Sequence, residues 1–383
     1  MELYVLDPLN RRQYVIDQFT SLIWTERWQA YGDFQLNTVS NYAMRSLLKP
    51  DTWLAMNRSN YVMRVESVED DFNDDGTRAL IIKGRSIEGI FDDRVSASLL
   101  WTNPPAVIAR DMFHEVCVGG TWDAEDIIPG IVEGTFLPAS TILEPADAIT
   151  IDYTGSTPPT LFGGMVTDVC AKYDLGFRIL RQDSNAQLYF DIYAGSDRTT
   201  DQTILPPVVF APQLDNLQNT KELTDISTAK NVAYVLQTGG VITKVYGVGV
   251  DPTTSSFERR VLIVDATNLT SPTTAQLTQA GLEALAGART NYLFDGEVSQ
   301  IQSQYKYGAD YNLGDLIEQQ NTDGVQSDMR VTEQIFSQDS TGEFSYPTLA
   351  NYDTINSGTW LGWNNNKAWF DLDSDETTWS EEP

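Results

Sequence analysis

Residues 61–94, YVMRVESVEDDFNDDGTRALIIKGRSIEGIFDDR, decide the fold of this chain more than any other stretch. Apolar and polar side chains alternate from residue 62 to residue 67, which is the period of a β-strand with one buried face. Residues 74–76 (Asp-Asp-Gly) are predicted to close a hairpin, because glycine supplies the positive φ of a tight turn. Ser86 is predicted to cap a short helix through residues 87–91. These residues therefore predict a β-hairpin that leads into a helix.

The bulk composition predicts a globular chain of several domains. A length of 383 residues suggests two to four domains, and 41% hydrophobic residues are enough to bury real cores. No apolar run approaches the ~20 residues of a membrane span. Residues 1–7 show no basic region and no cleavage site, so no secretory signal is expected.

The net charge of −29 argues against two kinds of binding partner. A strongly acidic surface repels phosphate backbones and anionic membranes, so direct binding to nucleic acid or to a membrane surface is not expected. We attribute this negative charge mainly to the solubility of the chain. Cys117 and Cys170 lie in helical apolar patterns without a CxxC motif, which predicts two buried, reduced thiols.

Patterning along the chain predicts four parts. Residues 1–100 read as all-β, and many short strands with turns about every ten residues indicate a barrel or sandwich. The strands expected there are 3–6, 12–16, 21–27, 34–39 and 52–57, followed by the hairpin. Residues 101–200 read as an α+β insertion. It contains a helix from Asn103-Pro104-Pro105 to Gly119-Gly120, a second helix from Pro158-Pro159 through Tyr173, closed by Gly176, and strands at 177–180 and 187–193.

Residues 201–350 return to β character around one helix, which is expected at 273–291. The expected strands are 208–210, 231–237, 242–248, 258–264, 297–305 and 343–349. Between the last two, Leu313-Gly314-Asp315 reads as a turn in which glycine permits the geometry and Asp315 accepts hydrogen bonds from backbone donors.

Residues 351–383 form an acidic extension with four of the nine tryptophans of the chain. The extension has no helical or strand period and is not expected to form a core of its own. Because tryptophan is favoured at interfaces, two outcomes stay open: the extension docks on a neighbouring protein, or it folds back on its own barrel.

Candidate sites for chemistry are weak. Asp71, Asn73, Asp75 and Gly76 match the start of a calcium loop, but Ile82 stands where calcium needs a bidentate acid, so an acidic hairpin turn is the better interpretation. His114 and Cys117 share one face of a predicted helix. No nucleophile motif surrounds Cys117, and a single histidine cannot supply a metal site alone.

Other local patterns are equally unspecific. Acidic pairs such as Asp92-Asp93, Asp70-Asp71 and Glu125-Asp126 are frequent in so acidic a chain, and Gly163-Gly164 and Gly239-Gly240 build no phosphate loop. The sequence therefore predicts no catalytic, cofactor-binding or metal-binding residue, no cofactor and no enzymatic activity.

Two blocks of sequence carry a resemblance to a known family. The hairpin block, residues 84–94, presents Gly84, Arg85, Ser86, Glu88 and Arg94. The turn block joins the Leu-Gly-Asp of residues 313–315 to Arg-Val-Thr-Glu at 330–333. With FTSLIWTERWQAYGDFQL at residues 19–36, they resemble the siphophage minor tail proteins that form the tail-tip hub, over most of residues 1–350.

The resemblance implies a mainly β fold, with two β-barrel domains of tail-hub type, at 1–100 and 201–350, around the α+β insertion. It implies a homotrimeric ring that joins the hexameric tail tube to the tail tip at the distal end of the virion tail. The implied partners are the distal tail or tail tube protein, the tail-tip or central fibre protein, and the tape measure protein. DNA is expected to pass through an acidic channel without specific binding, because like charges repel.

Two rival functions stay open. A tail-tip hydrolase of cell-wall polysaccharide needs a cleft with two carboxylates ~5–10 Å apart, and the sequence carries no appended hydrolase-like domain. A host-receptor binding protein would use the tryptophan-rich extension to stack on sugars.

Overall fold

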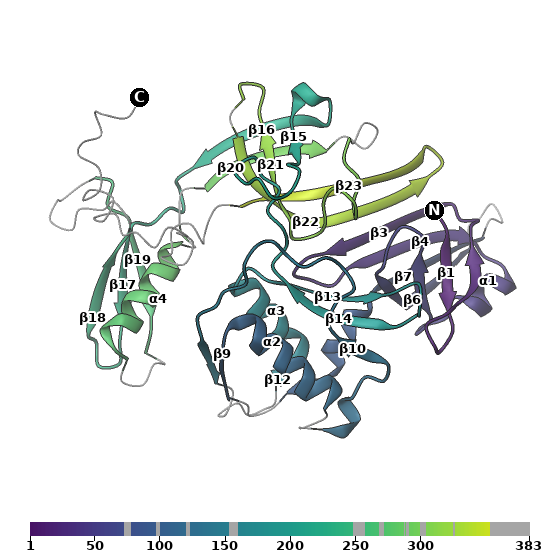
Figure 1. Ribbon diagram of the computed structural model, residues 1–383, viewed down its shortest axis with the longest axis horizontal. Helices are drawn as coiled ribbons and strands as arrows, with labels where there is room; N and C mark the ends of the chain where they lie inside the picture. The colour runs from purple at the N-terminus through teal and green to yellow at the C-terminus, as the bar shows by residue number, and fades with distance from the viewer. Residues whose placement is uncertain are drawn as a thin grey trace. The chain divides into compact units, whose positions relative to one another are not determined.

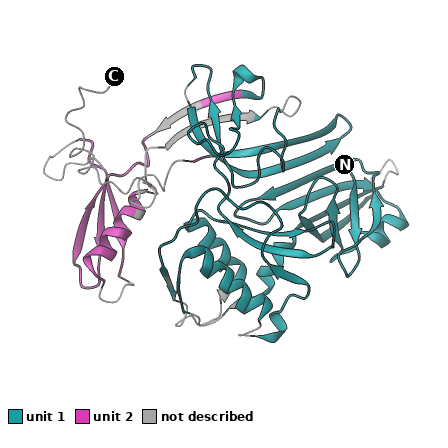
Figure 2. Ribbon diagram, viewed as in Figure 1, with its two compact units in different colours: residues 1–218, 298–350 teal, residues 219–297, 351–383 magenta. Residues whose placement is uncertain are grey.

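The computed structural model describes residues 1–72, 78–96, 100–119, 123–152, 160–247, 257–267, 272–286, 288, 291–298, 304–324 and 326–352. The chain forms two compact units (Figure 2). Unit 1 comprises Met1–Gln218 and Val298–Ala350, and unit 2 comprises Asn219–Glu297 and Asn351–Pro383. The predicted turn at residues 74–76, the entry Pro158-Pro159 of the second helix and nearly all of the 351–383 extension lie outside the described residues.

An eleven-stranded sheet dominates unit 1 (Figure 1). Its strand order is β15-β21-β22-β3-β4-β7-β6-β5-β1-β2, and β23 pairs with β22. The strands are β1 (Leu3–Leu6), β2 (Arg12–Ile16), β3 (Ser21–Arg27), β4 (Asp33–Val39), β5 (Trp53–Met56), β6 (Val62–Phe72), β7 (Arg78–Ser86), β15 (Val209–Phe210), β21 (Leu316–Gln320), β22 (Gln326–Asp339) and β23 (Gly342–Asn351). The helix α1 (Tyr42–Leu47) lies between β4 and β5 in the chain.

This sheet confirms the predicted β character and adds a connection that the sequence did not indicate. Strand β3 pairs with β22 along its whole length, with Trp24 opposite Phe336 and Arg27 opposite Glu333. The N-terminal and C-terminal strands of the chain therefore share one sheet. Among the described residues no pairing joins β15 to β2, so the path of strands is open at both ends.

The α+β part of unit 1 contains α2 (Pro105–Phe113), a π-helical turn η2 (His114–Val118) and α3 (Phe162–Lys172). They pack against a sheet of order β10-β14-β13. Its strands are β10 (Ile131–Glu133), β13 (Gly176–Arg181) and β14 (Leu188–Tyr193). Short elements complete this part: η1 (Ile87–Asp93), β8 (Val95–Ser96), β9 (Leu100–Asn103), η3 (Ala124–Asp126), β11 (Ile149–Asp152) and β12 (Thr160–Leu161). Another 3₁₀ turn, η4 (Pro212–Leu214), follows β15 of the large sheet.

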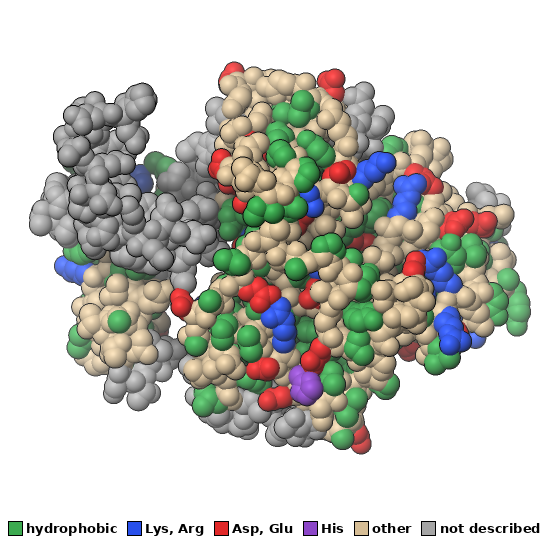
Figure 3. All heavy atoms as spheres, viewed as in Figure 1, with side chains coloured by type: hydrophobic (Ala, Val, Ile, Leu, Met, Phe, Trp, Pro, Cys, Tyr) green, Lys and Arg blue, Asp and Glu red, His purple; other side chains and the backbone are tan. Residues whose placement is uncertain are grey.

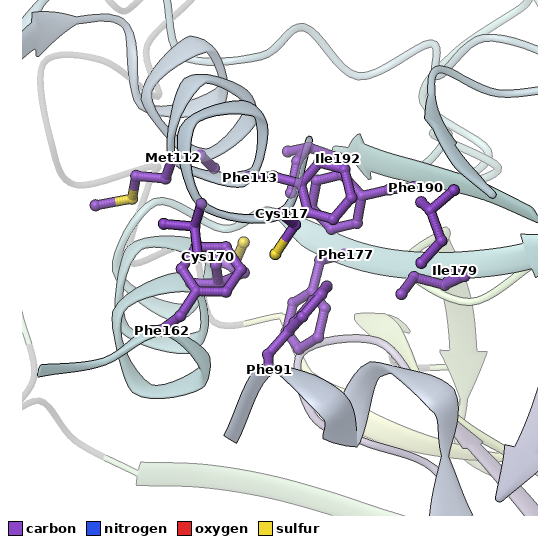
Figure 4. Packing of buried hydrophobic residues seen from close by; sticks show 14 of the residues in the cluster. Phe91, Met112, Phe113, Cys117, Phe162, Cys170, Phe177, Ile179, Phe190 and Ile192 are labelled. Atoms are coloured by element: carbon purple, nitrogen blue, oxygen red, sulfur yellow. The ribbon is translucent and has the colours of Figure 1, made fainter. Parts of the chain in front are cut away.

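An aromatic core lies between these helices and strands (Figure 4). The rings of Phe113 and Phe190 stack at 3.8 Å between centroids, and Phe91 meets Phe162 edge-on at 5.1 Å. Both predicted thiols, Cys117 and Cys170, are free and fully buried in this core, which confirms their interpretation as small hydrophobic residues.

Unit 2 contains a sheet of order β18-β17-β19 and the helix α4 (Thr274–Ala286). The strands are β17 (Val232–Leu236), β18 (Ile242–Tyr246) and β19 (Val261–Asp265). Strand β16 (Leu217–Asp225) pairs with β20 (Asn291–Val298) in a separate sheet. The helix predicted at 273–291 is therefore too long, because Asn291 already starts a strand.

Two other predicted boundaries are also wrong. Gly176 does not close α3, which ends at Lys172; it starts β13 instead. The strand predicted at 297–305 starts too late, because β20 (Asn291–Val298) already begins at Asn291, and residues 299–303 of the prediction lie outside the described residues. None of the helices in the described part of the chain is long and apolar enough to cross a membrane.

Candidate functional site

Gly84, the first residue of the hairpin block, lies where two strands approach closely. A Cβ at this position would overlap the carbonyl oxygen of Arg64 and lie 2.9 Å from the ring of Phe34. Opposite Gly84, β6 shifts its register between Val65 and Ser67. Only glycine fits this close approach without moving the backbone.

Arg85 connects the strand β7 to the turn η1. Its guanidinium pairs with Glu66 at 3.1 Å and with Asp92 at 2.7 Å, and it lies 5.6 Å from the ring centre of Tyr31. The hydroxyl of Tyr31 donates to the same Asp92 carboxylate at 2.9 Å. Several partners on one arginine orient η1 against β7, although each partly exposed pair is worth at most about 1 kcal/mol.

Ser86 does not cap η1, contrary to the prediction. Its side chain makes no capping hydrogen bond to the start of that 3₁₀ helix. Its buried Oγ instead accepts the backbone N–H of Gly32 at 2.9 Å, and the Gly32 carbonyl accepts the Ser86 N–H at 2.8 Å. The Ser86 hydroxyl therefore provides a hydrogen-bond acceptor for the buried N–H of Gly32, in the loop before β4, which would otherwise lack one.

Glu88 is a buried carboxyl group that joins the hairpin block to β13. The side chain is 2% exposed, and it accepts the backbone N–H of Ile179 at 2.5 Å. Burial raises the pKa of Glu88 to about 7, although hydrogen bonds from Ser86 and Ile179 oppose the shift. The last residue of the block, Arg94, donates to the Asp126 carbonyl at 3.0 Å.

Trp28 connects the turn block to the same region. Gly314 adopts a φ of +82°, and a Cβ there would lie 2.5 Å from the indole Nε1 of Trp28. A Cβ on Gly176 would overlap the same ring from β13. The guanidinium of Arg330 lies 4.4 Å from the indole ring. Two glycines and one arginine therefore enclose this tryptophan.

Asp315 fulfils the role predicted for it. Its carboxylate accepts the backbone N–H of Ser196 and of Asn312, each at 2.8 Å, and the Nε of Arg198 at 3.1 Å. The residue is 2% exposed, and burial raises the pKa of Asp315 against these hydrogen bonds. The turn is thus fixed by a carboxylate that bridges two segments far apart in sequence.

Arg330 and Glu333 complete the turn block. Arg330 donates to the carbonyl of Gly314 at 2.5 Å and to that of Ala194 at 3.2 Å, and it pairs with Asp174. Glu333 accepts from Arg27 at 2.7 Å, across the β3–β22 pair. The turn block therefore contacts the N-terminal sheet and the α+β part at once.

Glu26 is a third buried carboxyl group, and the sequence prediction did not single it out. It has no exposed surface and accepts hydrogen bonds from Tyr307 at 2.8 Å, from the indole of Trp24 at 3.3 Å, and from Ser59. Burial raises the pKa of Glu26 to about 7. The period-two pattern gave a signal, because Glu26 falls on the same face of its strand as Leu22 and Trp24.

Residues of both blocks thus contact the α+β part of unit 1, and we call these contacts together the junction. They join the large sheet to the α+β part through buried hydrogen bonds. Their carboxyl groups are enclosed or paired with arginine, as in the buried Arg178–Asp191 pair at 2.7 Å. This arrangement positions structural layers against one another.

The structure separates the residues of the candidate Cys-His pair. Burial raises the pKa of Cys117 to about 12, so its thiol stays protonated. His114, the only histidine, lies at the surface and its Nδ1 is 2.7 Å from Glu133 (Figure 3). Among the described residues no group of three or more potential metal ligands exists.

The other weak candidates also take part in ordinary surface contacts. Asp70 pairs with Arg45 and Arg78, and Asp93 pairs with Arg64 at 3.3 Å. Of the calcium-like loop, Asp71 belongs to β6, while Asn73, Asp75 and Gly76 lie outside the described residues.

Comparisons with known proteins agree with this architecture. A family model described as Siphovirus ReqiPepy6 Gp37-like protein matches residues 2–348. The tail protein from Neisseria meningitidis MC58 is similar in structure, with a TM-score of 0.57 and 13% identity over 94% of this chain and 98% of that chain. A search of curated proteins found no match.

Two prophage proteins are similar in the same way. The 43 kDa tail protein of prophage MuSo2 from Shewanella oneidensis has a TM-score of 0.57 and 13% identity, over 91% of this chain and 98% of that chain. The prophage tail protein gp18 from Listeria monocytogenes EGD-e has a TM-score of 0.51 and 13% identity, over 91% and 94%. At this identity the likeness concerns the fold.

Proposed function

Because the chain belongs to the Siphovirus ReqiPepy6 Gp37-like family of phage tail proteins, we propose that it is the structural hub at the distal end of the tail of a long-tailed phage. Three copies form a ring that joins the hexameric tail tube to the tail tip or central fibre. The ring contacts the distal tail or tail tube protein above, the tip protein below and the tape measure protein inside. The chain acts mechanically and is not an enzyme.

The contacts at the junction are the main support for this proposal. Residues from both blocks, separated by more than 200 positions, hold the large sheet and the α+β part together through buried contacts such as those of Asp315 and Arg330. A component that transmits force between a tube and a fibre needs layers that cannot slide. Buried charged hydrogen bonds resist sliding because breaking them leaves an unpaired charge inside the protein.

Exposed strand edges support assembly into a ring. Strand β2 is the last strand of the large sheet, and its Tyr14 and Val15 are 50% and 56% exposed. An open edge with apolar side chains invites pairing with another chain, and closed cyclic symmetry would cover such edges. In the proposed ring, two barrels per chain give pseudo-sixfold symmetry, which matches the tube.

The domain division belongs to the same proposal. Residues 1–100 and 201–350 contribute the first and second barrels, 101–200 the α+β insertion, and 351–383 the extension. The channel of the ring is lined with Asp and Glu, so DNA passes without adhering to it. A reconstruction of the tail tip with a neutral or basic channel would contradict this part.

Immunogold labelling of tailed virions tests the location. Gold-conjugated antibody against this protein is expected at the junction of tail tube and tip, and a threefold reconstruction of that region should then contain the chain. Label on side fibres would favour receptor binding. Particles without label would contradict the proposal that the chain is a virion component.

The alternative function is binding or hydrolysis of a host surface polysaccharide or receptor, and the tryptophan-rich extension is what favours it. Particles that lack residues 351–383 separate the two functions. Intact particles that fail to adsorb would favour receptor binding by the extension, whereas loss of tail assembly would favour a part in the hub.

A further inference from the structure

The helix α4 covers only one face of the sheet in unit 2 (Figure 1). Ala233, Val235 and Val245 form a core with Leu277 and Leu285 of that helix. The helix approaches closely at Gly281, where a Cβ would lie 2.6 Å from Val245. The alternate residues of each strand therefore point to the opposite face of the sheet.

Several apolar side chains of that opposite face are exposed, and we call it the open face. Tyr234 of the central strand lies between Lys244 of β18 and Ile263 of β19 in register. Ile263 is 74% exposed, Ile242 is 53% exposed and Val261 is 39% exposed. Exposed aliphatic side chains that share one face of a sheet favour a binding surface.

The open face carries two cations around its central tyrosine. The ammonium of Lys244 lies 5.4 Å from the ring centre of Tyr234. The guanidinium of Arg259 lies 6.0 Å from the same ring and donates to its hydroxyl at 2.9 Å. Asp265 is the acidic residue at the far end of this face, where its carboxylate accepts from Thr267. In a chain of net charge −29, two cations beside exposed isoleucines favour an acidic, apolar occupant.

We propose that the C-terminal extension of the same chain covers the open face, with residues 369–376 as the docking segment. This segment reads WFDLDSDE. Its tryptophan, phenylalanine and leucine cover Ile242 and Ile263, and its carboxylates pair with Lys244 and Arg259. The contact combines a buried apolar centre with charge pairs at the rim, as stable interfaces do.

Length and composition fit this occupant. Residues 353–368 would lie between the end of β23 and the docking segment, and they can span up to about 50 Å when extended. This inference does not depend on the proposed hub function, because it concerns the isolated chain.

Zero-length crosslinking of the full-length protein with a carbodiimide tests the contact. The expected product joins the Lys244 amine to a carboxylate within residues 371–376, identified by mass spectrometry. Lys221, an exposed lysine outside the open face, is the internal control. Crosslinks at Lys244 no more frequent than those at Lys221 would overturn the proposal.

A pair of matched variants tests the apolar part. Ile263→Asp places a negative charge on the open face, and Ile226→Asp does the same at a 48% exposed position outside it. Both original side chains are exposed, so both variants should fold, which circular dichroism checks. Amide hydrogens of residues 369–376 are expected to exchange at least about tenfold faster in Ile263→Asp than in the wild type, and unchanged in Ile226→Asp. Equal exchange in all three proteins would contradict docking.

A mixture of isotope-labelled and unlabelled chains separates docking within a chain from docking between chains. Crosslinks within single chains are expected. Crosslinks that join a labelled to an unlabelled peptide would show that the extension occupies the open face of a second copy, and would overturn the intramolecular assignment.

Discussion

Glu26 is a carboxyl group whose surroundings favour its neutral form. Burial removes the water that would solvate its charge, and this raises the pKa of Glu26 to about 7 from an ordinary 4.5. A raised pKa means that the folded protein holds a proton that the unfolded chain releases. The stability that follows is fully present below about pH 4.5 and is lost as the pH rises to about 7.

Glu26→Gln should therefore make the protein less sensitive to alkaline pH. Between pH 4.5 and pH 8, the free energy of unfolding of the wild type should fall by about 3 kcal/mol more than that of the variant, because glutamine stays neutral. Urea denaturation at several pH values measures the difference. Glu69→Gln, at an exposed position, is the control, and parallel pH profiles for wild type and Glu26→Gln would contradict the expectation.

Gly314→Ala and Gly308→Ala separate backbone strain from steric overlap. Both glycines have a positive φ, of +82° and +81°, but only the first has Trp28 against its missing side chain. Gly308→Ala is expected to lower the free energy of unfolding by about 1 kcal/mol, and Gly314→Ala by about 3 kcal/mol or more. Equal losses in chemical denaturation would show that Trp28 moves away freely.

Single residues show what the sequence could indicate and what it could not. The Leu-Gly-Asp motif predicted the turn at Gly314 and the acceptor role of Asp315 toward the Asn312 N–H, because both are local; the bond with Ser196, 119 residues away, is not. No local sequence pattern indicates the contact of Trp28 with Gly176, because this contact depends on how two distant segments pack. Glu26 was visible only as an acid on an apolar face, a pattern that does not reveal its partners.

At the scale of elements, the link between β7 and η1 depends on Ser86. Its Oγ satisfies the N–H of Gly32 and does not cap the helix. Ser86→Ala should cost about 1–3 kcal/mol, because a buried donor loses its partner. Ser86→Asp should cost more, since it buries a charge, even though aspartate is a good capping residue.

Denaturation of both Ser86 variants distinguishes the two roles. If aspartate restored stability above that of the alanine variant, the capping role predicted from the sequence would apply after all.

Strand positions were easier to predict than this link. The hairpin at 3–6 and 12–16 and the strand at 21–27 agree with the structure, because period-two alternation is a property of each strand by itself.

Helix ends were predicted less well than strands. The helix predicted at 273–291 starts within one residue of α4, but α4 ends at Ala286 and Asn291 already belongs to β20. Pairing with β16 decides the outcome, and β16 lies more than 60 residues earlier in the chain. Tertiary pairing, which a local pattern does not contain, overrides the helical period.

At the scale of the whole molecule, each unit has a hydrophobic cluster of its own. Two transitions are therefore expected in calorimetry of the full chain. Gly281→Leu should lower the midpoint temperature of only one transition, because the new side chain meets Val245 beneath α4. Gly314→Ala should lower the midpoint temperature of only the other transition. A single transition that both variants shift would show that the units unfold together.

Pairing of β3 with β22 has a consequence for how the chain is made. Arg27 and Glu333 are 306 residues apart, and at a synthesis rate of about 5–20 residues per second the ribosome needs roughly 15–60 seconds between them. During that time β3 presents an unpaired apolar edge. A chain that stops before residue 333 can never cover this edge, so prematurely terminated products should be captured by chaperones or proteases, and only finished chains would reach the assembling particle.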